Sequence, residues 1–160
     1  MYGTGTTFGE IKYKVTYEDD FEARLQLHGL KPNNWYLLTF QAGVWWEGSE
    51  IPDGAQGMFG HKHETVEQED GEVEWIDVAL VKTNDEGNVN AIIPTTSGLT
   101  GEDLKCRLYD FLFTSGDYTV AIVVKDVGFD PATGGPDLGL LLSGGTPILY
   151  EYDLMTFTVE

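Results

Sequence analysis

Two adjacent segments near the start of the chain alternate apolar and polar side chains residue by residue. In residues 10–17 (EIKYKVTY) every second residue is apolar, so the apolar side chains share one face of an extended chain. Residues 21–28 (FEARLQLH) repeat the pattern. A period of two is typical of a half-buried β-strand. The acidic residues 18–20 between the segments fit a tight turn, so the pattern predicts a β-hairpin.

Further segments of the same kind follow along the chain. Residues 35–46 (WYLLTFQAGVWW) are apolar on both faces, which is typical of a central strand covered on both sides. The other predicted strands are residues 73–83, 88–94, 106–113, 118–126 and 148–160. Two long segments rich in glycine, residues 43–72 and 127–147, are predicted as loops, and residues 95–105 as a connection with room for one helical turn.

No segment sustains the 3.6-residue period of an amphipathic helix. About eight strands joined by turns and two long loops predict an all-β fold, an antiparallel two-sheet β-sandwich of the Greek-key immunoglobulin-like kind. The 160 residues contain no internal repeat and no linker. We therefore expect a single domain over residues 1–160.

The charge of the chain restricts its partners. There are 27 acidic residues against 9 basic ones, a formal net charge of −18. Such a surface repels phosphate backbones and anionic lipids, so we expect no nucleic-acid or membrane-surface partner. It favours solubility, a bound cation or a basic protein partner. No apolar run reaches the roughly 18 residues of a membrane span.

Cysteine content and the N-terminal segment bear on the compartment. The single Cys106 excludes an intrachain disulfide and lies among apolar residues, so we expect a small buried hydrophobe. Residues 1–10 lack the basic and apolar regions of a secretory signal. Either the protein stays inside the cell or a leader precedes this start; from the expected fold we favour an extracytoplasmic or surface-exposed location.

Residues 29–40 (GLKPNNWYLLTF) carry a Gly-Leu-x-Pro-x-x-x-Tyr pattern. It resembles the corner of fibronectin type III and related immunoglobulin-like domains. The resemblance implies that Leu30 plugs the core and that Tyr36 forms a tyrosine corner. It implies a fold class and no activity.

A second resemblance is to the copper/zinc superoxide dismutase-like sandwich. In that family two strands lead to a Gly-Leu-x-Pro corner, and a later turn of the Asp-x-x-Gly-Asn kind enters another strand. Residues 27–34 and 82–94 occur in this order here. The strand after the corner lacks the family's His-x-His pair, and the chain has only three histidines. The resemblance implies a shared topology and argues against dismutase activity.

His61 and His63 are the first candidate metal ligands. In an extended chain residues two apart share a face, so both imidazoles could bind Zn²⁺ or Cu²⁺, with Glu64 as a further ligand. His28 and the carboxylates at 67, 69 and 70 are more distant candidates. A structural site requires about four closely held ligands. We therefore favour an exposed polar loop over a metal site.

Calcium is a separate candidate because carboxylates are abundant. Asp130 and Asp137 lie in the glycine-rich segment 127–147, and Asp85 lies in a predicted hairpin turn. Neither region has the spacing of an EF-hand loop. If Ca²⁺ binds, we expect Asp130 and Asp137 before Asp85.

The adjacent Trp45 and Trp46 are the strongest candidate for a binding site. In an extended segment one of the two rings must face away from the core. An exposed tryptophan next to Glu47 suits a sugar ring or a protein partner. The alternative, which we favour, is that the long loop folds back and covers both rings.

No catalytic arrangement is evident in the sequence. The serines lie in turns, without a nucleophile elbow or a nearby histidine. We therefore expect a non-enzymatic structural or binding module in a surface, filament or virion-type assembly, held by protein–protein contacts or self-assembly, with an N-terminal strand that could be donated to a neighbour. The alternatives are a carbohydrate-binding module using Trp45 and Trp46, and a metal-binding protein using His61, His63 and loop carboxylates. We expect no cofactor; Zn²⁺ and Ca²⁺ are the alternatives.

Overall fold

A computed structural model describes the fold. It covers residues 2–3, 8–15, 21–57, 60–67, 71–93 and 114–159. The predicted strand 106–113, its Cys106 and the predicted connection 95–105 lie outside the described residues.

The regular secondary structure of the described residues is almost entirely β-strand. The strands are β1 (Tyr2–Gly3), β2 (Phe8–Val15), β3 (Phe21–His28), β4 (Trp35–Gly43), β5 (Gln56–Gly57), β6 (Gly60–His61), β7 (His63–Glu67), β8 (Gly71–Lys82), β9 (Val89–Ile93), β10 (Gly116–Gly128), β11 (Thr146–Tyr150) and β12 (Met155–Val159). One short helix, α2 (Leu138–Leu142), lies between β10 and β11. Within the described residues, no helix has the length and apolar character needed to cross a membrane.

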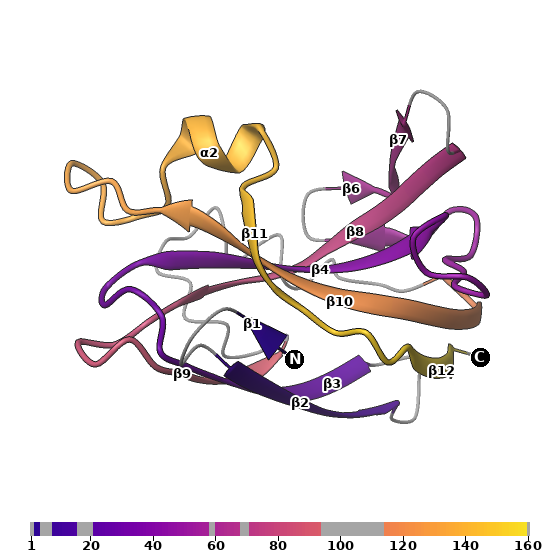
Figure 1. Ribbon diagram of the computed structural model, residues 1–160, viewed down its shortest axis with the longest axis horizontal. Helices are drawn as coiled ribbons and strands as arrows, with labels where there is room; N and C mark the ends of the chain where they lie inside the picture. Colours follow the sequence, from indigo (N-terminus) through magenta and orange to yellow (C-terminus); the bar gives the residue numbers. More distant parts are fainter. Residues whose placement is uncertain are drawn as a thin grey trace.

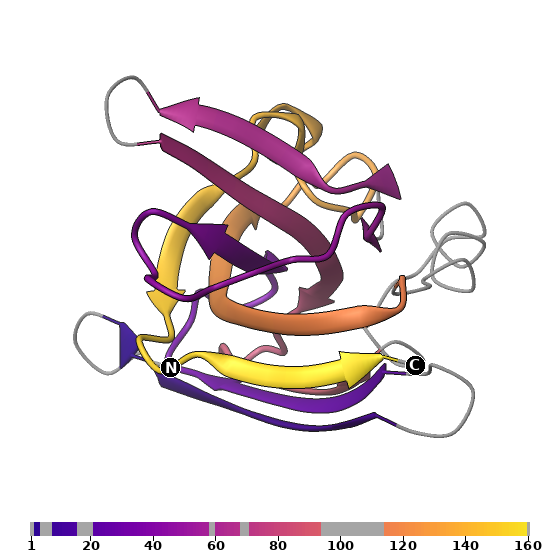
Figure 2. The same cartoon turned by 90° about the vertical axis from the view of Figure 1, so that its right-hand side faces the viewer.

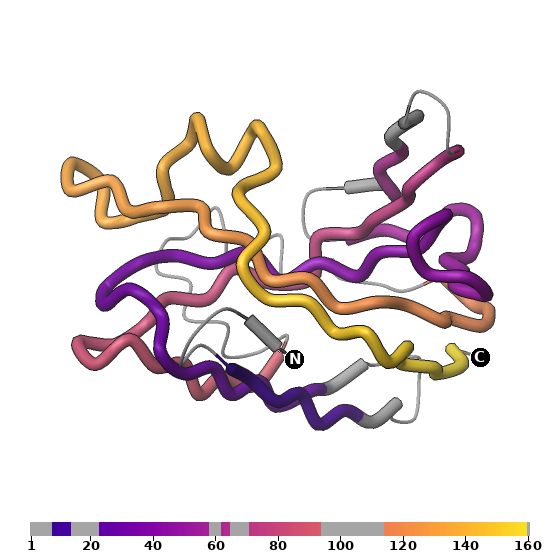
Figure 3. Tube along the Cα trace, in the orientation of Figure 1, coloured from indigo at the N-terminus to yellow at the C-terminus, as the bar shows by residue number. Residues whose placement is uncertain are grey.

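The strands form two antiparallel layers (Figures 1 and 3). The larger layer has the order β7-β8-β4-β10, with β11 and β12 following on the far edge of β10. The smaller layer is β2-β3-β9, and β1 joins the layers by pairing with both β11 and β2. The prediction of an all-β, two-sheet antiparallel sandwich is confirmed.

The hairpin of β2 and β3 pairs over all eight positions, from Phe8 with His28 to Val15 with Phe21. The apolar segment after the corner becomes β4, which lies between β8 and β10 and is buried over residues 35–42. The alternating and doubly apolar patterns therefore identified the edge hairpin and the central strand correctly.

The final predicted strand, residues 148–160, is wrong as a single element. It is two strands, because β11 pairs with residues 123–126 of β10 and β12 with residues 116–120. The polar residues between them turn the chain, and the Asp153 amide donates to the Glu151 carboxylate (3.2 Å). Figure 2 shows β12 between β10 and the β2–β3 hairpin, where Tyr13 Oη donates to the Thr156 carbonyl (2.9 Å).

The two predicted loops also contain regular structure. In residues 43–72, β5 pairs with β6 and β7 pairs with β8, so part of this excursion extends the larger layer. In residues 127–147, α2 is capped by Asp137, whose side chain accepts from the Leu140 amide (3.0 Å). None of these elements has a strong periodic signal, because β5 and β6 have two residues each and β7 and α2 have five each.

The core lies between the inner faces of the two layers. Large, fully buried side chains of this core come from β4, β3, β8 and β10, among them Tyr36, Phe40, Leu25, Leu27, Ile76 and Tyr118. The corner between β3 and β4 has the geometry that its resemblance implied. Leu30 packs against the core, and the Lys31 amide donates to the Tyr36 hydroxyl (3.0 Å).

Candidate functional site: an aromatic cleft on the outer face of the larger layer

The outer face of the larger layer divides into a covered part and an open part. The covered part is a small second core of Trp35, Leu37, Leu80 and Val127, against which Leu141 of α2 packs. Trp35 Nε1 donates to the Gly134 carbonyl (2.9 Å), which holds the 128–145 segment over this end of the sheet. The excursion after β10 thus leaves the other end of the face uncovered.

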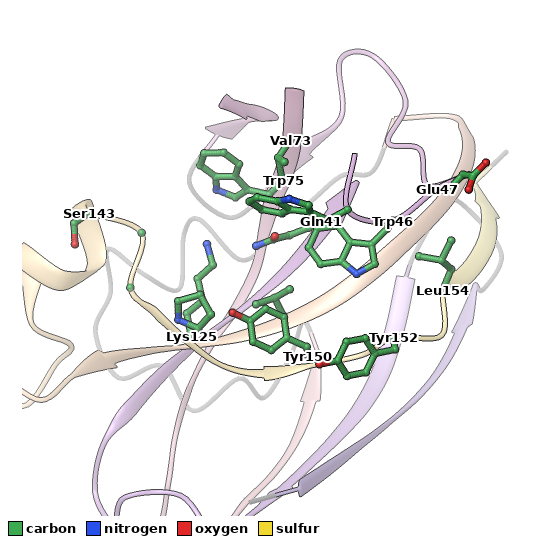
Figure 4. Close-up of a pocket in the computed structure, with 15 residues that line it drawn as sticks. Gln41, Trp46, Glu47, Val73, Trp75, Lys125, Ser143, Tyr150, Tyr152 and Leu154 are labelled. Atoms are coloured by element: carbon green, nitrogen blue, oxygen red, sulfur yellow. The ribbon is translucent and has the colours of Figure 1, made fainter. Parts of the chain in front are cut away.

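The open part is a cleft of about 820 Å³ (Figure 4). Its floor is formed by neighbouring strands of the sheet, with Trp75 on β8, Gln41 on β4, and Val123 and Lys125 on β10. Gln41 is the registered partner of Trp75, so the two side chains lie beside each other on this face. A volume of this size is in the range of sites that enclose a small organic ligand.

The first wall of the cleft is the segment that follows β4. It contributes Trp45, Trp46 and Glu47, so the structure brings all three predicted binding residues to one site. The two indoles meet edge to face with centroids 5.9 Å apart. Trp45 is 56% exposed, so the expectation that the loop would cover both rings is wrong.

Hydrogen bonds fix this wall to the sheet. The Trp46 amide donates to the Gly43 carbonyl (2.9 Å), and the Gly43 amide donates to Ser49 Oγ (2.9 Å). Ser49 Oγ in turn donates to the Trp46 carbonyl. Beyond it, the Glu50 and Thr119 backbones exchange two hydrogen bonds (2.6 and 3.0 Å), so the tryptophans stand on a braced turn.

The opposite wall comes from the C-terminal part of the chain. Tyr150 at the end of β11, with Tyr152 and Leu154 in the link to β12, faces the tryptophans across the cleft. Tyr152 is 73% exposed. Five aromatic side chains from three separate parts of the sequence therefore line one hollow: Trp45, Trp46, Trp75, Tyr150 and Tyr152.

A charged cluster lies at the floor and beside it. His63 Nε2 lies 3.1 Å from Asp77 Oδ2, and the His63 ring stacks on Trp75 with centroids 5.2 Å apart. Lys125 Nζ lies 5.4 Å from the Trp75 ring centroid. Burial raises the pKa of the Asp77 carboxyl, which His63 and Lys125 oppose. Burial also lowers the pKa of the Lys125 amine, which Asp77 opposes.

The predicted histidine site stays a prediction, because one of its two histidines is not fully described. His61 lies in β6 and its side chain is outside the described residues, whereas His63 begins β7 and contacts Asp77. Glu64 is exposed, and His28 lies on β3 in the other layer, beside Asn88. Among the described residues, no three His, Cys, Asp or Glu side chains are grouped to hold a metal.

The two predicted calcium ligands are engaged in local turns. Asp130 accepts from the Ala132 amide (2.9 Å) and from the Thr133 hydroxyl (3.2 Å). Asp137 caps α2 through the Leu140 amide. Both carboxylates thus have a structural role, and Ca²⁺ binding at either stays a prediction.

Apart from Trp45, Trp46 and Glu47, the residues of the cleft were not identified from the sequence, among them Trp75, Lys125, Tyr150 and Tyr152. One available signal was a charged residue inside an apolar strand segment, as at Asp77 in WIDVALV and Lys125 in AIVVKDV. Charged side chains are rarely buried without a partner, so such positions mark a polar feature on an otherwise apolar face.

Comparison of the chain with protein-family models, with curated proteins and with solved structures found no match. The function proposed below therefore depends on the residues of the cleft.

Proposed function

We propose that this chain is a non-enzymatic carbohydrate-binding β-sandwich module whose ligand site is the aromatic cleft. The observation that carries the proposal is the placement of Trp45 and Trp46 on one wall opposite Tyr150 and Tyr152 on the other, with an open hollow between them. The apolar faces of sugar rings pack on aromatic side chains, and their hydroxyls hydrogen-bond to polar groups beside them. Gln41 and Lys125 supply such groups on the floor.

The charge of the cleft disfavours another ligand that aromatic rings attract. Cations, quaternary ammonium groups above all, bind to clusters of tryptophan and tyrosine. Here the Lys125 amine already lies over the Trp75 ring and would repel a second cation. A neutral or acidic ring compound is therefore favoured over a cationic one.

Binding is favoured over hydrolysis by the acidic groups present. Glycoside hydrolysis ordinarily requires two carboxyl groups on opposite sides of the scissile bond. Among the described residues that line the cleft, Glu47 is the one carboxylate. Asp77 lies beside the floor and is engaged by His63.

A glycan array with the purified protein, followed by tryptophan-fluorescence titration of the glycans that bind, tests the proposal. We expect Trp46→Ala and Tyr152→Ala each to weaken binding about tenfold or more, the loss expected for about 1.4 kcal/mol of binding free energy. Phe129→Ala is the matched control, because Phe129 is an exposed ring outside the cleft. The absence of glycan binding, or equal losses in all three variants, would contradict the proposal.

A structural role in a surface, filament or virion-type assembly is the second candidate. Its supporting observation is the pair Leu138 and Leu142 on α2, which are 64% and 86% exposed. Light scattering over a range of concentrations tests it, with Leu142→Asp expected to abolish any self-association. Strand donation by the N-terminus is less favoured, since β1 pairs with β11 and β2 of its own chain.

Kinship with immunoglobulin and fibronectin type III domains, or with dismutase-like sandwiches, also remains a proposal. It is supported by the two-layer antiparallel architecture and by the hydrogen bond between the Lys31 amide and the Tyr36 hydroxyl. An extracytoplasmic location fits such modules, and protease protection of the protein in intact cells would test that location.

A further inference from the structure

Lys125 is placed at the floor of the cleft by the register of the sheet. It pairs with Leu37 of β4, two residues along from the pair of Val123 with Thr39, and so lies on the same outer face of the sheet as that pair. Its side chain points into the hollow in Figure 4, yet the residue is only 9% exposed. The walls around it therefore remove most of the water from a long cationic side chain.

The surroundings of this amine leave its charge incompletely balanced. Its contact is the Trp75 ring, while Asp77 interacts with it only at longer range and is hydrogen-bonded to His63. Among the described residues, none accepts a hydrogen bond from Lys125 Nζ or forms a direct ion pair with it. An ammonium group carries three donors, and a buried one is costly unless oxygen atoms accept from it.

An anionic oxygen satisfies such a group better than a neutral hydroxyl does. Hydrogen bonds between an ammonium and a carboxylate are shorter and about twice as strong as those between neutral groups. The low dielectric of a desolvated floor strengthens this preference. The chemistry of the floor is therefore matched to a ligand with one carboxylate.

The rest of the protein limits how much negative charge the ligand can carry. The chain has a net charge of −18, and Glu47 lies on the first wall, so a densely charged polymer is repelled. A single carboxylate at the floor, with uncharged ring faces against the walls, avoids that repulsion. We propose that the cleft binds a glycan bearing isolated uronic acid residues, and that Lys125 Nζ binds the carboxylate of one of them.

This inference rests on the proposed carbohydrate-binding function, and matched ligands separate the two. The probes are two disaccharides, one with a single glucuronic acid residue and one with a single galacturonic acid residue. Each is compared with its methyl ester, which keeps the ring and removes the charge. Titration by tryptophan fluorescence at fixed ionic strength should show at least tenfold tighter binding of the acid than of its ester for one of the two pairs.

The variant that tests the residue is Lys125→Gln, which keeps a polar side chain of similar length. We expect it to lose the preference for the acid, so that it binds the acid and the ester with equal affinity. Lys82→Gln is the matched control, because Lys82 also lies over an aromatic ring (Phe129, 5.1 Å) but outside the cleft. Circular dichroism of both variants confirms folding, and the comparison of acid with ester in the parent protein does not depend on either variant.

Three results would overturn the inference. Equal binding of acid and ester by the parent protein would reject the carboxylate and leave the carbohydrate function standing. An acid preference that persists in Lys125→Gln would reject Lys125 as its partner. Binding of neither acid nor ester, together with a negative glycan array, would reject the proposed function and the inference with it.

Discussion

His63 and Asp77 are joined across β7 and β8, with His63 Nε2 3.1 Å from Asp77 Oδ2. Asp77 is buried, so loss of this partner leaves a carboxylate without its hydrogen bond. We expect His63→Ala to lower the free energy of unfolding by about 1–3 kcal/mol at neutral pH. Urea denaturation measures this loss, and Glu64→Ala, at the adjacent exposed position, should change it by less than about 0.5 kcal/mol. Equal stability of His63→Ala and the parent protein would contradict the expectation.

The sequence identified the strands better than it identified the site. Alternation in β2 and β3, and the doubly apolar character of β4, are local properties that follow directly from burial. The cleft depends on the pairing of β8 and β10 with β4, strands that are far apart in the sequence. Trp46 and Tyr152 become neighbours of one hollow only through that pairing, which no local pattern encodes.

The limits of local pattern are also visible at the C-terminal end. Residues 148–160 look like one strand because apolar residues continue through them, but β10 accepts β11 and β12 at two separate parts of its edge. The corner between β3 and β4 was easier to predict from the sequence, because Tyr36 and Lys31, whose hydroxyl and amide form its hydrogen bond, are only five residues apart.

The corner itself gives a second prediction. Tyr36 is buried and its hydroxyl accepts from the Lys31 amide (3.0 Å). Tyr36→Phe removes the hydroxyl that accepts this hydrogen bond, so the Lys31 backbone N–H loses its acceptor. The free energy of unfolding should therefore fall by about 1–2 kcal/mol. Thermal and urea unfolding measure this. Tyr152→Phe, at an exposed ring, is the control and should unfold like the parent protein.

Acid stability provides a third prediction through Asp126. Burial opposes ionisation of this carboxyl, but hydrogen bonds from Lys31 (2.8 Å), Asn34 (2.8 Å) and the Gly128 amide (2.9 Å) lower its pKa overall. A carboxyl with a lowered pKa in the folded state stabilises the protein above its unfolded pKa of about 3.9. That contribution is lost as the pH falls through the folded pKa.

Asp126→Asn should therefore destabilise the protein by about 1–3 kcal/mol at neutral pH. The difference from the parent protein should shrink as the pH falls from the unfolded pKa of about 3.9 through the lowered folded pKa, where Asp126 of the folded protein itself becomes protonated. Urea unfolding of both proteins across this pH range is the measurement. A difference that is the same at every pH would show that the Asp126 charge does not contribute.

The turn that presents the tryptophans gives a fourth prediction. Gly43 has φ = 139°, and a Cβ there would overlap the carbonyl oxygen of Glu72 on the neighbouring strand. Gly48 also has a positive φ (81°), but no atom lies within 4 Å of its Cβ position. Gly43→Ala should therefore lower the free energy of unfolding by about 1–3 kcal/mol more than Gly48→Ala does, because it adds a steric overlap to the backbone strain. Thermal unfolding measures the difference, and near-ultraviolet circular dichroism should show an altered tryptophan signal in Gly43→Ala alone.

Lys125 gives a fifth prediction, in which stability and binding move in opposite directions. A buried ammonium without a direct carboxylate partner costs stability, so replacing it with an apolar side chain of similar length removes that cost. Lys125→Met should leave the free energy of unfolding unchanged or raise it by up to about 4 kcal/mol. Sites that destabilise the fold are commonly retained for function, and the same variant should bind acidic glycans less tightly.

Lys31→Met is the contrasting control, because Lys31 Nζ donates to the buried Asp126 carboxylate at 2.8 Å. Its replacement should lower stability, by about 1 kcal/mol, since the Lys31 side chain is largely exposed and solvent weakens its charge interaction. Urea unfolding of the two variants gives the comparison directly. A clear loss of stability in Lys125→Met would mean that this lysine supports the fold through Trp75 and Asp77, and the reason for placing a ligand carboxylate beside it would be gone.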